Sequence, residues 1–301
     1  MRFLIYLLTS ALFFSCTEPV HERANKKIKI VCTTSIMADW VSNVATDQME
    51  VVPLLRVGVD PHVYKPSKKD LDLLREADVI IYHGLHLEGK IIEVLQHMED
   101  KLIIDAAKKF PNELIIRDPN FPASTDPHAW FDKRLAQSSI ATIVEELSQK
   151  YEDEKRELAE NKNVYFKALD KVTNQVASII NTIPPQRRLV ITTHDALSYF
   201  ARQYGFQVKT LQGASTVSEF GLRDITDLVD IIVEKQVPAI FLENIVSPQA
   251  MESVQRGCAS KGFEVKIGPE LLSDSLGSEE DQNTYFKMLI FNANTIAEYL
   301  N

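Results

Sequence analysis

The sequence predicts an α/β fold of two lobes, each with a parallel sheet of about four βα units, joined by one long bracing α-helix. Short apolar runs alternate with helix-patterned segments over residues 29–105 and again over residues 189–267. Such alternation is typical of parallel α/β sheets. Between these two regions, residues 152–183 contain neither proline nor glycine. A chain of 301 residues is long enough for two domains of ordinary size.

The first lobe is predicted to comprise residues 27–131. Its expected strands are short apolar runs of the kind found in buried parallel sheets, at residues 29–33, 51–55, 79–82 and 102–105. Helical periodicity between these runs predicts helices over residues 68–76 and 89–98.

The segment 132–183 is predicted to be helical and to contain the long linking helix. From residue 152 onward, charged residues alternate with apolar ones at helical spacing, and Pro184-Pro185 stops the pattern. At 1.5 Å per residue, about 30 helical residues span roughly 45 Å. We therefore expect a brace along both lobes rather than a flexible hinge. A coiled coil is the alternative, but the heptads are weak.

The second lobe is predicted to comprise residues 184–301. Its expected strands are residues 189–193, 207–211, 239–242 and 264–267. Expected helices cover residues 222–235 and 248–260. The pattern of the first lobe is thus repeated.

Residues 1–16 have the pattern of a lipoprotein-type signal peptide. Met1-Arg2 provides a positive start, and the apolar run that follows is too short for a membrane span. Cys16 follows a small serine, as at bacterial lipoprotein cleavage sites, and is expected to carry lipid; an ordinary cleavable signal is the alternative. Residues 17–26 are polar and predict a tether.

Composition excludes several classes of function. The chain has 33 basic and 42 acidic residues, a net charge of −9, which argues against nucleic acid as a partner. It lacks a His-Glu-x-x-His helix, a Gly-x-Ser-x-Gly elbow and a phosphate-cradling glycine loop. We therefore expect a binding protein rather than an enzyme. A disulfide between Cys32 and Cys258 is not expected, because it would have to cross between the lobes.

Four side chains stand at positions where a metal site would form. The tripeptide Asp-Pro-His occurs twice and puts His62 and His128 in proline-stiffened loops. His194 directly follows an expected strand, and Asp274 follows the last one. The carboxyl edge of an open α/β sheet is where ligands bind. Imidazole nitrogens and one carboxylate suit zinc or a related divalent transition metal, here at the interface of the lobes.

Six motifs in this order resemble the zinc and manganese solute-binding lipoproteins of bacterial ABC importers, the TroA-like or ZnuA-like family. They are TTSIMAD at 33–39, DPHVY at 60–64, DPHAW at 126–130, THDALSYF at 193–200, LQGAST at 211–216 and SDSLG at 273–277.

The resemblance covers nearly the whole chain after residue 26. It implies two α/β lobes joined by a long helix, with His62, His128, His194 and Asp274 as the metal ligands. It implies an extracytoplasmic, lipid-anchored monomer in the cell envelope that delivers Zn²⁺ or Mn²⁺ to an ABC permease and its ATPase. A zinc-dependent hydrolase and a surface adhesin are the alternatives.

The sequence contains features of both zinc-binding and manganese-binding members of this family. Manganese members of the family often carry glutamate where this chain has His194, and three nitrogens with one carboxylate favour zinc. However, many zinc members carry a histidine-rich loop before the second ligand, and residues 111–125 contain no histidine.

Supporting roles are also expected near the ligands. A histidine ligand usually donates its other ring N–H to a carboxylate or carbonyl. Glu243, Glu219 and Asp60 are candidates for this role. Trp130 is expected to shield the site or to belong to the core.

Overall fold

The computed structural model describes residues 27–117 and 124–301. The expected signal peptide, Cys16 and the tether therefore lie outside the described residues. In the described ranges, no helix is long and apolar enough to cross a membrane.

The first lobe contains a four-stranded parallel sheet in the order β2-β1-β3-β4. Its strands are β1 (Ile28–Cys32), β2 (Met49–Pro53), β3 (Val79–Tyr82) and β4 (Leu102–Asp105). In the central strand β1, Ile30 pairs with Val51 on one side and with Val79 on the other. The four expected strands are confirmed, with shifts of one or two residues at β1 and β2.

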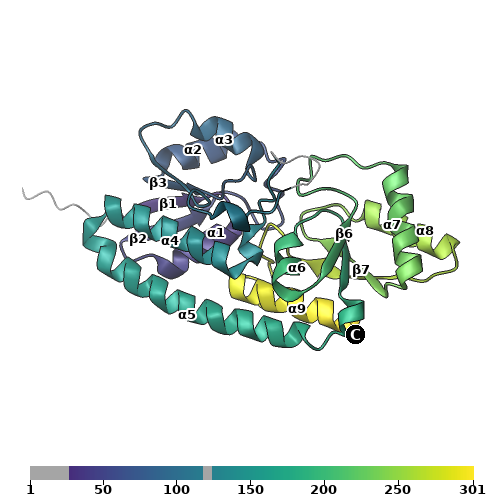
Figure 1. The fold of residues 1–301 in the computed structure, drawn as a ribbon. Coiled ribbons are helices and arrows are strands. Elements are labelled where there is room, and N and C mark those ends of the chain that lie inside the picture. The colour runs from purple at the N-terminus through teal and green to yellow at the C-terminus, as the bar shows by residue number, and fades with distance from the viewer. Residues whose placement is uncertain (1–26, 118–123) are drawn as a thin grey trace, which may run out of the picture.

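Helices cover this sheet, as Figure 1 shows. They are α1 (Ser35–Val44), α2 (Lys68–Glu76) and α3 (Gly89–Leu95). Helix α2 coincides with the expected range and begins with a capping box, in which Ser67 and Asp70 each accept the other's backbone N–H. Helix α3 ends three residues before the expected position, where a turn begins.

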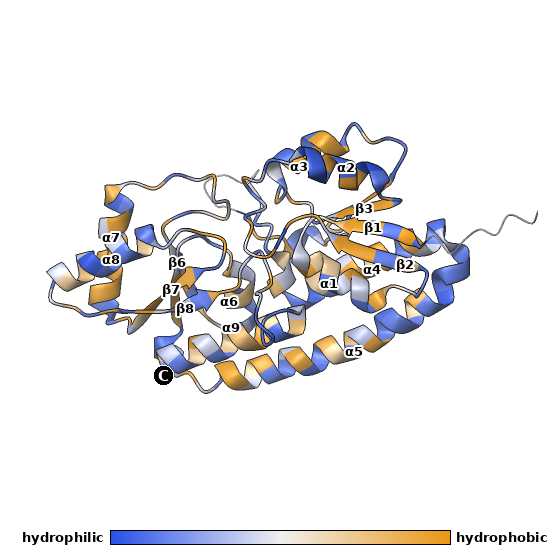
Figure 2. Ribbon diagram, turned by 180° about the vertical axis from the view of Figure 1, so that it is seen from behind, coloured by the Kyte–Doolittle hydropathy of each residue, from blue (hydrophilic) through white to orange (hydrophobic). Residues whose placement is uncertain are grey.

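The long linking helix is α5 (Lys155–Ile180), 26 residues that follow α4 (Lys133–Lys150) along the chain. It is shorter than expected, because residues Glu152–Glu154 form a 3₁₀ turn and the chain tightens again after Ile180. Figure 2 shows apolar and polar residues alternating along α5. The apolar stripe packs against α1, α4 and the C-terminal helix α9 (Tyr285–Leu300).

The second lobe has the four expected strands, paired two by two. The pairs are β5 (Leu189–Thr192) with β6 (Gln207–Thr210), and β7 (Ala239–Glu243) with β8 (Lys266–Leu271), both parallel. Strand β8 begins two residues later than expected and is longer. Its helices include α6 (Ser198–Tyr204), α7 (Leu222–Lys235) and α8 (Gln249–Ser260).

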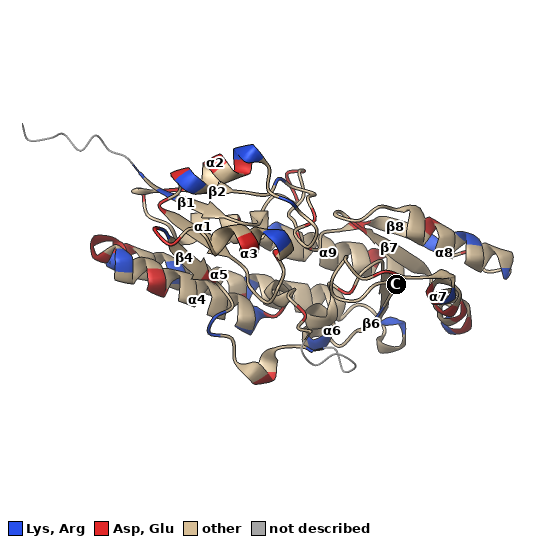
Figure 3. Cartoon of the chain, turned by 90° about the horizontal axis from the view of Figure 1, so that it is seen from above, with Lys and Arg blue, Asp and Glu red and all other residues tan. Residues whose placement is uncertain are grey.

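One hydrophobic cluster extends through both lobes, and each lobe has a smaller cluster of its own. The shared cluster contains Ile30 of the first sheet, Phe241 of the second lobe and Leu169 of α5. Trp40 and Tyr285 meet edge to face across the lobes, with ring centroids 5.3 Å apart. Figure 3 shows charged residues on the helices of both lobes and in the loops between them. Apolar packing across the lobes supports a brace and opposes a wide hinge motion.

The two cysteines of the described chain are free and buried. Cys32 lies in β1 and Cys258 in α8.

Candidate metal centre

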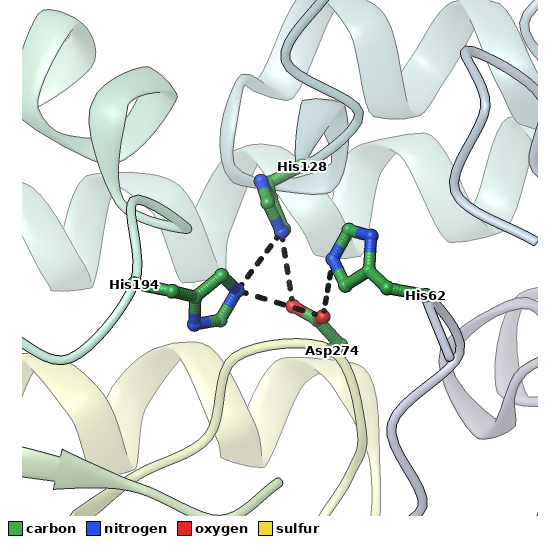
Figure 4. A group of neighbouring side chains, drawn as sticks. All are labelled: His62, His128, His194 and Asp274. Carbon is green, nitrogen blue, oxygen red and sulfur yellow. Dashed lines mark hydrogen bonds and ion pairs between the residues drawn. The ribbon is translucent and has the colours of Figure 1, made fainter. Parts of the chain in front are cut away.

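The structure brings the four predicted side chains together between the lobes. One ligand atom from each of His62, His128, His194 and Asp274 lies within 4.8 Å of all the others. Figure 4 shows the three rings and the carboxylate facing a common centre. All four residues are buried, with exposed fractions between 0% and 5%. Among the described residues, this is the one group of its kind.

Loops at the carboxyl ends of strands position these side chains. His62 lies in the loop after β2, His194 follows β5, and Asp274 follows β8. His128 directly precedes a 3₁₀ turn, Ala129–Phe131, that leads into α4. Parallel strands of both lobes therefore aim their carboxyl ends at one point, as open α/β sheets do at ligand sites.

Four of the interatomic distances at the centre are close to the edge length of a tetrahedral zinc site. His62 Nε2 lies 3.1 Å from Asp274 Oδ2, and His128 Nε2 lies 3.2 Å from Asp274 Oδ1. His194 Nε2 lies 3.2 Å from His128 Nε2 and 3.7 Å from Asp274 Oδ2. Zinc bonds of 2.0–2.2 Å in a tetrahedron separate the ligand atoms by about 3.3 Å. These contacts, which involve both oxygens of Asp274, are thus near the spacing that one zinc ion requires, and the set of four ligand atoms lies within 4.8 Å.

The two Asp-Pro-His tripeptides form the same local turn. Asp60 Oδ1 accepts the backbone N–H of His62 at 2.8 Å, and Asp126 Oδ1 accepts that of His128 at 2.9 Å. An aspartate that binds the backbone two residues further on is an Asx turn. The tripeptide therefore fixes the main chain that carries each imidazole.

Two buried carboxylates orient the rings of His128 and His194. Asp126 Oδ1 lies 2.7 Å from His128 Nδ1, and Glu243 Oε1 lies 2.7 Å from His194 Nδ1. With Nδ1 beside a carboxylate, the Nε2 atom of each ring faces the centre, where it can bind a metal once it is deprotonated. The two Nε2 atoms lie 3.2 Å apart, so that, when deprotonated, both can bind the same cation.

Charge at the centre shifts the pKa values of its members. Burial raises the pKa of the Asp274 carboxyl, but His128 and His194 outweigh burial and hold it well below its usual range. Burial lowers the pKa of His128, yet the carboxylates of Asp274 and Asp126 raise it to about 9. The pKa of His194 is raised well above its ordinary value, because Glu243 and Asp274 outweigh burial. The carboxylates therefore favour positive charge at this centre, which protonated imidazoles or a metal ion can supply.

Several polar atoms at the centre have no well-directed hydrogen bond. They include His62 Nε2 and both carboxylate oxygens of Asp274, which are buried. A buried polar atom without a hydrogen bond destabilises the folded state by about 1–3 kcal/mol. A bound divalent ion would satisfy His62 Nε2 and one oxygen of Asp274 at once. The residues present therefore fit a metal ion.

The expected supporting residues differ in what they contact. Glu243 binds the ring of His194 as expected, whereas Asp60 binds the backbone of His62 rather than its ring. Glu219 is exposed on a loop. Asp126 was missed as the partner of the His128 ring, although its place in the repeated tripeptide was the available signal.

Trp130 both shields the centre and braces it. Its ring centroid lies 5.3 Å from that of His128, and its exposed fraction is 2%. Its Nε1–H donates to the carbonyl oxygen of Ser273 at 3.0 Å, directly before Asp274. The indole therefore links the loop of one ligand to the loop of another.

The chain matches one known protein family over most of its length. Residues 30–299 match the family described as ZnuA, zinc-uptake complex component A, periplasmic. The chain belongs to the ZnuA family. Members of this family are substrate-binding components of ABC importers for metals and work with a permease and an ATPase. They are not enzymes.

Relatives of this chain are named for different metals. The manganese-binding lipoprotein MntA of Bacillus subtilis is 37% identical over 299 residues, which cover 98% of this chain and 97% of MntA. The zinc-binding protein TroA of Treponema pallidum is 35% identical over 281 residues, covering 92% and 90%.

Solved structures of similar proteins share the fold. The periplasmic zinc-binding protein TroA of Treponema pallidum superimposes with a TM-score of 0.87, covering 91% of this chain and 99% of TroA at 35% identity. Fe(III)-bound YtgA of Chlamydia trachomatis has a TM-score of 0.82 at 22% identity, with 91% and 98% covered. The predicted two-lobed α/β fold with a long helix is thereby confirmed.

Proposed function

We propose that this chain captures one divalent transition-metal ion outside the cytoplasm and delivers it to an ABC permease. His62, His128, His194 and Asp274 bind the ion. The observation that carries this proposal is the convergence of three Nε2 atoms and one carboxylate within 4.8 Å of one another, buried between the lobes.

The donor set favours zinc as the ion, with manganese as the second candidate. Three imidazole nitrogens suit zinc better than manganese, which prefers oxygen ligands. Four contacts among these side chains, of 3.1–3.7 Å, are near the ligand spacing of a tetrahedral zinc site. Manganese remains a candidate because a relative of comparable similarity is named a manganese-binding lipoprotein.

Capture rather than catalysis also follows from the number of ligands. A catalytic zinc site usually has three protein ligands and one open position for water. Four protein side chains face this centre, and each is buried. An ion held in this way is enclosed and has no free position for a substrate.

Titration of the chelator-stripped protein by calorimetry tests the proposal. Zinc is expected to bind with a stoichiometry of one, and manganese more weakly. The His194→Ala variant should lose most of the zinc affinity while remaining folded. The matched control is His97→Ala, because His97 is exposed. Failure of the wild-type protein to bind either ion at a one-to-one ratio would refute the proposal.

We further propose that Cys16 becomes the lipidated N-terminus and that the chain acts as a monomer. The serine before Cys16 and the preceding apolar run support lipidation, and relatives are named lipoproteins. Metabolic labelling with a radioactive fatty acid should mark the wild-type protein and leave Cys16→Ala unlabelled. Equal labelling of both would refute lipidation at Cys16. Sedimentation of the soluble protein tests the monomer.

A further inference from the structure

The segment 212–221, called here the cleft loop, links β6 to α7 in the second lobe. Its own hydrogen bonds order its tip. Gln212 Nε2 donates to the carbonyl oxygens of Thr216 and Ser218, at 3.2 Å and 2.7 Å. Ser218 N–H donates to Ser215 O at 3.0 Å. The tip around Thr216 is therefore a defined turn.

The base of the cleft loop is bound to both chain neighbours of His194. The backbone N–H of Gln212 donates to Thr193 O at 2.9 Å, and the backbone N–H of Asp195 donates to Gly213 O at 3.2 Å. Movement of the loop base is thus coupled to the main chain that carries one candidate ligand.

The tip of the cleft loop reaches the first lobe. Thr216 Oγ1–H donates to Asp60 Oδ2 at 2.6 Å, across 156 positions of sequence. The other oxygen of the same carboxylate accepts the His62 N–H. Among the described residues, this is the one hydrogen bond between the cleft loop and the first lobe. Asp60 therefore joins the loop anchored beside His194 to the loop that carries His62.

An enclosed ion leaves only when a ligand moves away. His62 belongs to a surface loop, and separation of this loop from the second lobe must break the Thr216–Asp60 bond. The same loop makes one more hydrogen bond nearby, from Gly58 N–H to Ser275 Oγ at 2.8 Å. The bond between Thr216 and Asp60 joins two side chains that are both half-buried. It can therefore be removed without altering the main chain or any ligand.

We propose that the Thr216–Asp60 hydrogen bond is a latch that sets the rate at which the bound metal ion leaves. This inference rests on the proposed function. Neither Thr216 nor Asp60 belongs to the four candidate ligands, so the bond gives no donor atom to the ion. Such a contact shifts the binding equilibrium only if its strength differs between the loaded and the empty protein, whereas it slows every opening that must break it. Thr216 is thus a positioning residue that controls rates of entry and release more than affinity.

Stopped-flow transfer of zinc from the loaded protein to excess chelator measures the release rate. Thr216→Val keeps the shape of the side chain but lacks the hydroxyl, and we expect roughly tenfold faster release, the loss typical of a hydrogen bond to a charged group. Thr216→Ser keeps the hydroxyl and should release zinc at the wild-type rate. Thr226→Val is the control, because the Thr226 hydroxyl binds only its own helix.

The outcomes separate the latch from a structural role and from the proposed function. Faster release in Thr216→Val with an unchanged dissociation constant supports the latch, and Thr216→Ala should behave in the same way. Wild-type release in Thr216→Val, or equal acceleration in Thr216→Ser, would refute the latch alone. Failure of the wild-type protein to take up zinc would refute the proposed function and the latch together.

Discussion

The two Asp-Pro-His tripeptides form the same turn, but their aspartates make different second contacts. In both, the aspartate accepts the histidine N–H, at 2.8 Å for Asp60 and 2.9 Å for Asp126. Asp126, 4% exposed, also binds the ring of its own histidine. Asp60 is half-buried and binds Thr216 of the other lobe instead. The same three residues thus serve to orient one ligand and to connect the lobes around another.

This difference shows what the tripeptide itself encodes. The sequence Asp-Pro-His fixes the turn and the direction of the main chain, because the aspartate and the histidine amide are only two residues apart. The second carboxylate contact depends on which groups the fold brings near. Affinity is therefore expected to depend more on Asp126, and exchange rates more on Asp60.

Asp274→Ala should lower zinc affinity more than any other change considered, because Asp274 faces the histidines of both tripeptides. Its two oxygens lie 3.1 Å from His62 Nε2 and 3.2 Å from His128 Nε2. Loss of a direct ligand should exceed the roughly 100-fold upper limit for loss of an outer partner. Competition with a zinc chelator measures the affinity. A loss below tenfold would remove Asp274 from the ligand set.

Substitution of the two aspartates compares the tripeptides directly. Asp126→Ala removes the group that orients the His128 ring, and zinc affinity should fall about 10- to 100-fold. Asp60→Ala leaves the rings oriented, so its loss of affinity should stay below about tenfold, the size of an ordinary hydrogen bond. The two dissociation constants, measured under identical conditions, test this order. Equal losses of zinc affinity would contradict the different roles of Asp60 and Asp126.

The pH dependence of binding should also separate the two aspartates. In the absence of metal, the pKa of His128 is about 9, so zinc must displace a proton at lower pH. Affinity should weaken as pH falls below about 9, by up to roughly tenfold per pH unit for each proton displaced. Asp126→Asn removes a charge that raises this pKa, and the onset should move to lower pH. Asp60→Asn should leave the onset unchanged; a pH-independent wild-type affinity would contradict histidine ligation.

The smallest effect on zinc affinity is expected from Gly89→Ala, which disturbs only the loop of the first tripeptide. A Cβ atom on Gly89 would lie 2.6 Å from the carbonyl oxygen of His62, so Gly89→Ala must displace that loop. Such overpacking lowers the free energy of unfolding by about 1–3 kcal/mol, with a modest loss of zinc affinity. In the control Gly213→Ala, the added atom would meet Ser218 Oγ at 3.6 Å, an ordinary contact. Thermal unfolding and chelator competition measure both effects.

Much of the fold and the clustering of the four candidate ligands could be predicted from local patterns. Apolar runs identified all eight described strands, because buried parallel strands require them. The residues after these strands identified His62, His194 and Asp274, because parallel strands end at a common edge. The repeated tripeptide identified His128.

Other features depend on contacts between distant positions and carry no local signal. The pairing of the second-lobe strands as two separate sheets depends on packing, which the apolar pattern does not encode. Glu243 could be suggested as a partner for His194, but nothing nearby excluded Glu219. The contact between Thr216 and Asp60 joins positions 156 residues apart. The helix α5 ended earlier than Pro184 required, because the chain tightens after Ile180.

The central claim is that one metal ion lies between the three histidines and Asp274. Anomalous diffraction at the zinc absorption edge, from crystals of the zinc-loaded protein, tests it most directly. We predict one strong peak at about 2.0–2.2 Å from the Nε2 atoms of His62, His128 and His194 and from Asp274. A peak elsewhere, or none at this centre in crystals of stoichiometrically loaded protein, would contradict the account.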